Sequence, residues 1–140
     1  MRHLALLFLS LCLSLPALAE RKQSFGDLDV HYIAFNSSFL QPDIAAASGL
    51  VRSKTQGVMN ISVLKAGNPI TAGVSGEVKN LLGRSYPLNF KQVKEGAAIY
   101  YLAQFPFDSR EVLRFSIKVQ ASDGVTRSLD FNQEFFPDDQ

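Results

Sequence analysis

Three side chains, Asp27, Asp29 and His31, have the types and the spacing of metal ligands. They stand at alternate positions of a segment that reads as a β-strand, so their side chains share one face. Two such neighbours can chelate one metal ion, and a third ligand could come from another part of the chain. The alternative is that the trio forms the solvent-exposed side of a half-buried strand, where charge protects a sheet edge.

Residues that could carry out catalysis are scarce. The sequence has two histidines, His3 and His31, and one cysteine, Cys12. A serine or cysteine nucleophile needs a base such as histidine, and only His31 lies outside the leader segment identified below. We find no phosphate-binding loop and no dinucleotide fingerprint. The sequence therefore predicts a protein that is not an enzyme and that has no cofactor.

Two other segments could form a partner surface. Arg52, Ser53 and Lys54 form a compact basic triplet before a predicted strand, and such a triplet can bind a carboxylate or phosphate. Phe105 and Phe107 flank a proline at a predicted strand end, and exposed aromatic side chains often mark interfaces. The plainer alternatives are that the triplet is a solvated loop and that the two phenylalanines close the end of the core.

The amino terminus has the three parts of a secretory signal peptide. A basic start is followed by an apolar run over residues 4–15, and Ala17-Leu18-Ala19 then matches the small-x-small pattern of a cleavage site. The apolar run is shorter than the roughly 20 residues that span a bilayer. We therefore assign residues 1–19 to a cleaved signal peptide and residues 20–140 to a single domain without a stable membrane anchor.

Cleavage would remove the cysteine, and small exported domains without disulfides are typical of the bacterial periplasm. It would also remove one of the 14 basic residues and none of the 13 acidic ones, which leaves a neutral domain. Nucleic-acid-binding proteins carry a strong positive field, so nucleic acid is not an expected partner.

Short segments of alternating apolar and polar residues, separated by turn residues, predict an all-β, immunoglobulin-like antiparallel β-sandwich. One segment differs, because residues 42–48 begin with proline and are followed by Gly49, which predicts a short helix. About seven strands are expected, at Asp27–Phe35, Val58–Lys65, Ala72–Asn80, Tyr86–Phe90, Ala97–Phe105, Glu111–Ala121 and Val125–Phe136.

The last two predicted strands should form a hairpin. Both carry their apolar residues at odd positions, so facing residues must sum to an even number and the loop must have an odd length. We expect a three-residue loop with Gly124 in the left-handed conformation. Ile117 would then face Leu129, and Phe115 would face Phe131.

The stretch from Phe39 to Lys65 resembles a family of small exported proteins of Gram-negative bacteria that is known only as a domain of unknown function. The likeness is carried by Pro42-Asp43-Ile44-Ala45, by Arg52-Ser53-Lys54 and by Asn60-Ile61-Ser62-Val63. It implies a periplasmic β-sandwich and no particular activity, and it draws attention to Arg52, Ser53, Lys54 and Asn60. The segment from Val63 to Val74 is also similar to a hairpin of bacterial immunoglobulin-like domains, a likeness that concerns fold alone.

Together these features predict a periplasmic, non-enzymatic binding or assembly module whose partner is another envelope protein. The partner surface would include Arg52, Ser53 and Lys54, or Phe105 and Phe107. The alternative is a periplasmic carrier of a small ligand or metal that uses Asp27, Asp29 and His31.

Overall fold

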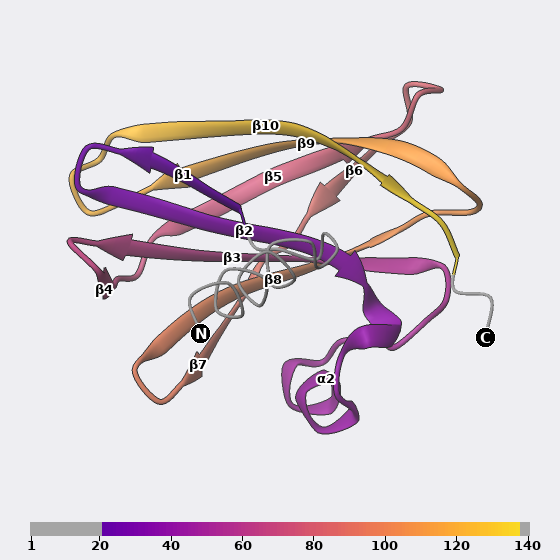
Figure 1. The fold of residues 1–140 in the computed structure, drawn as a ribbon, viewed down its shortest axis with the longest axis horizontal. Helices are drawn as coiled ribbons and strands as arrows, with labels where there is room; N and C mark the ends of the chain where they lie inside the picture. Colours follow the sequence, from indigo (N-terminus) through magenta and orange to yellow (C-terminus); the bar gives the residue numbers. More distant parts are fainter. Residues whose placement is uncertain (1–20, 138–140) are drawn as a thin grey trace, which may run out of the picture.

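Ten β-strands form in residues 21–137, the part of the chain that this computed structural model describes. The strands make two antiparallel sheets that pack face to face (Figure 1), which confirms the all-β sandwich. Sheet A has the order β1 (Arg21–Phe25), β2 (Leu28–Asn36), β3 (Gln56–Lys65), β8 (Ala98–Pro106) and β7 (Lys91–Glu95), and β4 (Asn68–Pro69) pairs with the end of β3. Sheet B has the order β10 (Thr126–Phe135), β9 (Glu111–Gln120), β5 (Gly73–Lys79) and β6 (Ser85–Leu88).

All seven expected strands are present, and three more were not expected. Of these, β4 has only two residues. The other two, β1 and β7, lie at the edges of sheet A and are mostly exposed, with Phe25 and Val93 as their only large apolar residues. An edge strand that buries so little has no apolar alternation to reveal it.

The core lies between the two sheets and is rich in aromatic rings. Phe115 of β9 is fully buried, and its ring centroid lies 5.1 Å from that of Phe105 and 5.0 Å from that of Phe131. Phe135 lies 5.2 Å from Phe105 and 6.0 Å from Phe115. These four rings join β8 of sheet A to β9 and β10 of sheet B, so they hold the two sheets together.

The β9–β10 hairpin has the expected register, with Ile117 opposite Leu129 and Phe115 opposite Phe131. Gly124 adopts the expected left-handed conformation, with φ of 77°. The loop, however, has five residues (121–125) instead of three, because the last paired residues are Gln120 and Thr126. The odd length required by the pattern of buried residues is therefore confirmed, and the exact length was wrong.

Asp123 explains the longer loop. Its carboxylate accepts hydrogen bonds from the Arg127 guanidinium at 2.8 Å and from the Val125 backbone N–H at 3.0 Å. The bond from Arg127 and then the bond from Val125 lower the pKa of Asp123 to about 2. The ionised carboxylate thus closes a wide turn, and Val125, expected on the apolar face, is 53% exposed.

The expected helix is α2 (Pro42–Ser48), which follows the short 3-10 helix η1 (Ser37–Phe39). Pro42 stands in its first turn, and Gly49 ends it with φ of 67°. The helix packs on the outer face of sheet A, where Leu40 and Ala45 join Val58 and Leu102 in a second, smaller core. Figure 1 shows α2 beside the carboxyl-terminal end of β2.

Strand direction gathers four segments at one end of the sandwich, at the right of Figure 1. We call this the loop end, and it comprises residues 37–55, 80–84, 107–110 and 136–137. The Phe107 N–H donates to the Thr55 carbonyl at 3.0 Å and so connects two of these segments. The side chain of Asn36, the last residue of β2, donates to the Phe136 carbonyl at 3.1 Å and holds a third segment next to the first.

Candidate functional site

Exposed apolar side chains are concentrated at the loop end. Of the six large apolar residues that are exposed within residues 21–137, five lie there, and Val125 lies at the opposite end. The five are Phe39, Val51, Leu81, Leu82 and Phe136. Leu81 and Leu82 belong to the β5–β6 loop, and the other three belong to the segments around the basic triplet and the end of β10. Exposed apolar side chains that gather in this way commonly mark interaction surfaces.

The basic triplet is held at this end by a buried serine. The Ser37 hydroxyl donates to the Ser53 carbonyl at 3.0 Å and accepts from the Ser53 N–H at 2.8 Å, and Ser37 is fully buried. Both backbone groups of Ser53 are thereby satisfied within the fold. Ser53 therefore fixes the loop, and its neighbours Arg52 and Lys54 are the residues that project into solvent.

Arg52 is itself partly ordered, because its guanidinium donates to the Ser38 carbonyl at 3.0 Å. The preceding residue, Val51, is fixed through its backbone: the Gln104 side-chain amide donates to the Val51 carbonyl and accepts from the Val51 N–H. The Val51 side chain remains exposed. The loop thus presents an arginine, a lysine and an apolar side chain from a rigid backbone, which lowers the entropic cost of binding.

Phe105 and Phe107 do not contribute to this surface. They are 1% and 3% exposed, and both rings contact Phe135 in the core. Residues at i and i+2 face the same side, and Phe105 belongs to the inward face of β8 with Tyr101 and Ala103. The sequence-based assignment of these two rings to the partner surface was therefore wrong, and the alternative that they close the core describes their position.

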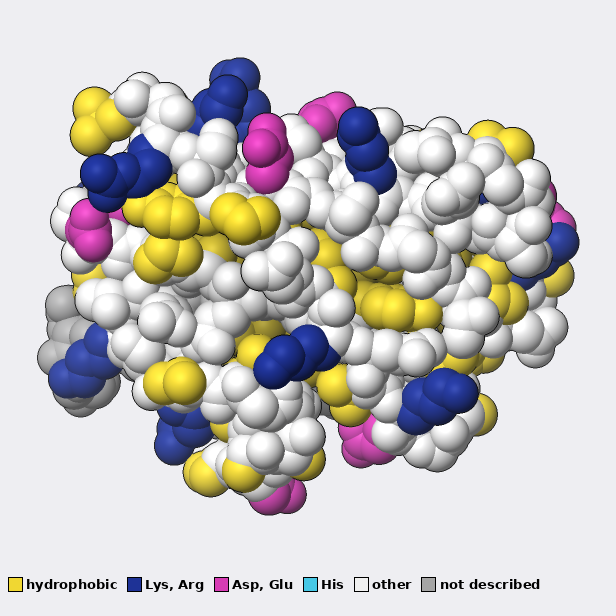
Figure 2. Space-filling view, turned by 180° about the vertical axis from the view of Figure 1, so that it is seen from behind, with side chains coloured by type: hydrophobic (Ala, Val, Ile, Leu, Met, Phe, Trp, Pro, Cys, Tyr) yellow, Lys and Arg dark blue, Asp and Glu magenta, His cyan; other side chains and the backbone are white. Residues whose placement is uncertain are grey.

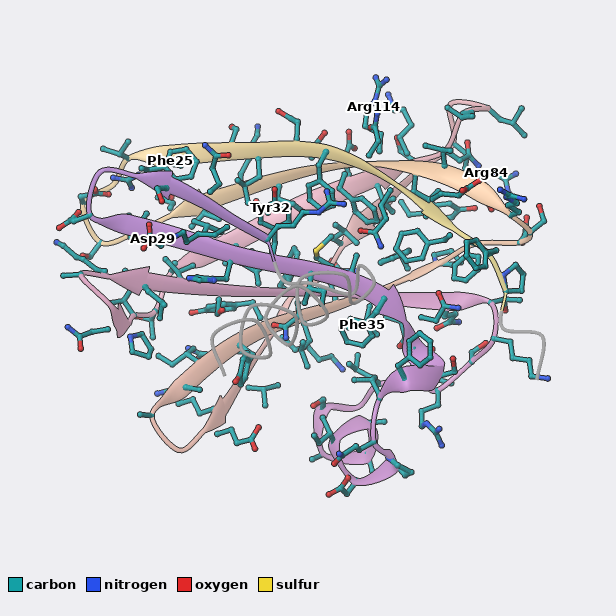
Figure 3. All side chains as sticks on the ribbon, in the orientation of Figure 1. Phe25, Asp29, Tyr32, Phe35, Arg84 and Arg114 are labelled. Carbon is teal, nitrogen blue, oxygen red and sulfur yellow. The ribbon has the colours of Figure 1, made fainter. Side chains whose placement is uncertain are left out.

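The candidate metal ligands are only partly brought together. Asp27 lies in the β1–β2 turn, while Asp29 and His31 are half-buried on the outer face of β2. The Asp29 carboxylate accepts a hydrogen bond from the Ser24 hydroxyl at 2.6 Å. Within residues 21–137, no three His, Cys, Asp or Glu side chains are grouped so that they could hold a metal ion. Figure 3 shows Asp29 toward the opposite end of β2 from Phe35 and so away from the loop end.

The sequence matches the family described as a domain of unknown function, DUF4426, over residues 22–138. The chain belongs to the DUF4426 family. The family resemblance inferred from residues 39–65 is thereby confirmed. The domain is also similar to a DUF4426 family protein from Pseudomonas aeruginosa whose crystal structure is known, with 54% identity, a TM-score of 0.81, and coverage of 86% of this chain and 97% of that one.

The DUF4426 domain also has the fold of two structures of FetP from uropathogenic Escherichia coli strain F11. The protein as isolated has 10% identity and a TM-score of 0.61, and a copper-bound variant has 12% identity and a TM-score of 0.57. Each comparison covers 85% of this chain and 95% of FetP. None of the curated proteins compared with the chain matches it.

The most exposed part of the DUF4426 loop end was not predicted from the sequence. Leu81 and Leu82, in the loop between β5 and β6, are 78% and 95% exposed. Two adjacent leucines in a short turn were a usable signal, because turns normally take small or polar residues. Asn60, which the family resemblance emphasised, lies in β3 with a buried side-chain oxygen that has no hydrogen-bond partner among residues 21–137.

The predicted signal peptide, residues 1–19, lies outside the described residues. Within residues 21–137, no helix has the length and apolar character needed to cross a bilayer.

Proposed function

We propose that this DUF4426 domain is a periplasmic, non-enzymatic binding module that holds another envelope protein at its loop end. One observation carries the proposal: three exposed large apolar side chains of the loop end, Phe39, Val51 and Phe136, lie on the segments around the exposed cations Arg52 and Lys54. Protein interfaces are enriched in aromatic residues and arginine, and their centre is apolar with a polar rim.

Arg52 and Lys54 would contact acidic groups of the partner, while Phe39, Val51 and Phe136 would supply apolar contacts. The hydrogen bonds of Ser37 and Gln104 keep the loop in one conformation before the partner arrives. A pre-ordered loop loses little conformational entropy on binding, so a modest surface can still give a specific complex.

The double substitution Arg52→Ala and Lys54→Ala tests this surface. We expect recovery of the envelope partner, captured with the tagged protein from cells, to fall about tenfold, because two interfacial cations are lost. The melting temperature should not change, since both side chains are exposed and only the bond to the Ser38 carbonyl is removed.

The matched control is Lys65→Ala with Lys94→Ala, two exposed lysines away from the loop end. This variant should retain the partner. Unchanged recovery with the Arg52 and Lys54 variant would contradict the proposed surface, as would a fall in melting temperature that parallels the loss of partner.

The likeness to copper-bound FetP supports a second candidate, a metal carrier that uses Asp27, Asp29 and His31. Asp29 and His31 do share the outer face of β2, but Asp29 is already bonded to Ser24. Metal analysis of untagged protein purified without chelator separates the two candidates. Stoichiometric copper that is lost in a His31→Ala variant would favour the metal carrier. Sub-stoichiometric metal in the unchanged protein would exclude the carrier and favour the binding module.

A further inference from the structure

The β5–β6 loop presents two leucines from a rigid turn. The Asn80 side-chain carbonyl accepts hydrogen bonds from the Leu82 N–H at 3.1 Å and from the Arg84 N–H at 2.9 Å. The Asn80 N–H also donates to the Arg84 carbonyl at 3.0 Å, and Gly83 supplies the left-handed conformation that the turn requires. These hydrogen bonds fix the turn in a conformation that leaves the side chains of Leu81 and Leu82 exposed to solvent.

A cationic hollow lies directly beside these leucines. Lys79 of β5 is opposite Arg114 of β9, and Arg114 is opposite Asn132 of β10, so the three side chains form a row on the outer face of sheet B. The row lines a hollow of about 210 Å³ together with Leu81 and Gly83. Figure 3 shows Arg114 pointing outward on the side of the β5–β6 loop.

Two like charges directly opposite on neighbouring strands repel each other. Within residues 21–137, neither Lys79 nor Arg114 forms a salt bridge with a carboxylate. The nearby acidic side chains Asp108 and Glu111 line a separate hollow, where the Glu111 carboxylate accepts from the Asp108 N–H. Glu77 of β5 and Asp130 of β10 lie on the same face one pairing position away, opposite Ser116, and neither forms a salt bridge with this pair within residues 21–137. The two cations therefore have no directly bonded carboxylate there, and an anionic ligand would reduce their repulsion.

We infer that the β5–β6 loop and this hollow bind the surface of an anionic phospholipid bilayer. Leu81 and Leu82 enter the boundary between headgroups and acyl chains, while Lys79, Arg114 and Asn132 donate hydrogen bonds to a lipid phosphate. A phospholipid has an anionic phosphate next to apolar chains, and this surface has a cationic hollow next to two exposed leucines. A free phosphate ion would make no favourable contact with the leucine side chains, whereas the acyl chains of a lipid would, so we favour a lipid over a free ion as the ligand.

The arrangement is visible from outside the molecule. Figure 2 shows an apolar projection at the upper left, between basic side chains, where the β5–β6 loop of Figure 1 lies. Arg84 adds a further cation beside the loop and donates to the Tyr86 hydroxyl. Acidic side chains also lie near these basic ones in Figure 2. An apolar tip with cations beside it is a common pattern of interfacial membrane attachment.

Vesicle flotation of the purified processed protein tests the inference. We expect binding to vesicles of phosphatidylcholine mixed with phosphatidylglycerol, and about tenfold weaker binding to vesicles of phosphatidylcholine alone, because the neutral bilayer lacks the surface charge that attracts the cations. The variant Leu81→Ser with Leu82→Ser should lose at least about tenfold in partition to anionic vesicles, since two leucines leave the membrane. The variant Lys79→Ala with Arg114→Ala should lose a similar factor.

Val125→Ser is the matched control, because Val125 is an exposed apolar residue at the other end of the sandwich. The Val125→Ser variant should float as the unchanged protein does. The melting temperature of every variant should equal that of the unchanged protein. No flotation, or equal flotation of the leucine variant, would overturn the inference. Two further results would also overturn it: full displacement by millimolar inorganic phosphate, which would indicate a free-anion site, and crosslinking of Leu82 in cells to a protein instead of to lipid.

Discussion

Replacing Phe115 with alanine is expected to lower the free energy of unfolding by about 4 kcal/mol, the range for a buried phenylalanine. Phe115 is fully buried, and its ring contacts those of Phe105, Phe131 and Phe135. The substitution removes apolar surface and also leaves a cavity between the sheets. The melting temperature should fall by about 15 °C, measured by thermal unfolding followed by circular dichroism.

Phe136→Ala is the matched control, because Phe136 is the same residue type and is exposed at the loop end. Its effect should stay within about 0.5 kcal/mol, as for most surface substitutions. Similar losses for the two variants would show that the ring cluster does not hold the sheets together as described.

Replacing Gly57 with alanine should produce the second large effect, a loss of about 3 kcal/mol. Gly57 of β3 stands opposite Phe105 of β8, and a Cβ added at Gly57 would collide with the end of the Phe105 ring. The ring cannot move away freely, because it is 1% exposed and packed against Phe115 and Phe135. Overpacking at this position therefore disturbs the centre of the core.

Gly73→Ala provides the control in denaturant unfolding. A Cβ at Gly73 would meet only the Gln120 carbonyl oxygen, at an ordinary contact distance of 3.8 Å, so the change should be within about 0.5 kcal/mol of neutral. Combining Gly57→Ala with Phe105→Leu should cost less than the sum of the two single changes, because the smaller side chain relieves the collision. Strict additivity would count against this explanation.

Much of the fold could be predicted because alternation of apolar residues reports burial. It located the seven strands with buried faces and gave the register of the β9–β10 hairpin. The alternation of apolar residues does not reveal β1, because the first four residues of that strand are exposed. It also does not predict the length of the β9–β10 loop. That length depends on the Asp123 carboxylate, a side-chain interaction with no periodic signal.

The proposed binding surface was harder to predict, because a residue type does not say on which side of a sheet the residue lies. Phe105 and Phe107 were taken as surface aromatics, although the parity of β8 already placed Phe105 with the buried Ala103. Arg52 and Lys54 were suggested by their position in a basic triplet before a strand, but the loop end became visible only when the strand directions were known. Leu81 and Leu82 were overlooked because a turn was not expected to carry apolar residues.

The central claim, that the loop end of this DUF4426 domain binds an envelope protein, is tested most directly by photocrosslinking in living cells. A photoreactive amino acid would replace Phe39 or Phe136 at the loop end, or Val125 at the other end, and the crosslinked species would be identified by mass spectrometry. We expect one envelope protein to be captured reproducibly from both loop-end positions and not from position 125. Equal capture from all three positions, or no protein captured from the loop end, would contradict the claim.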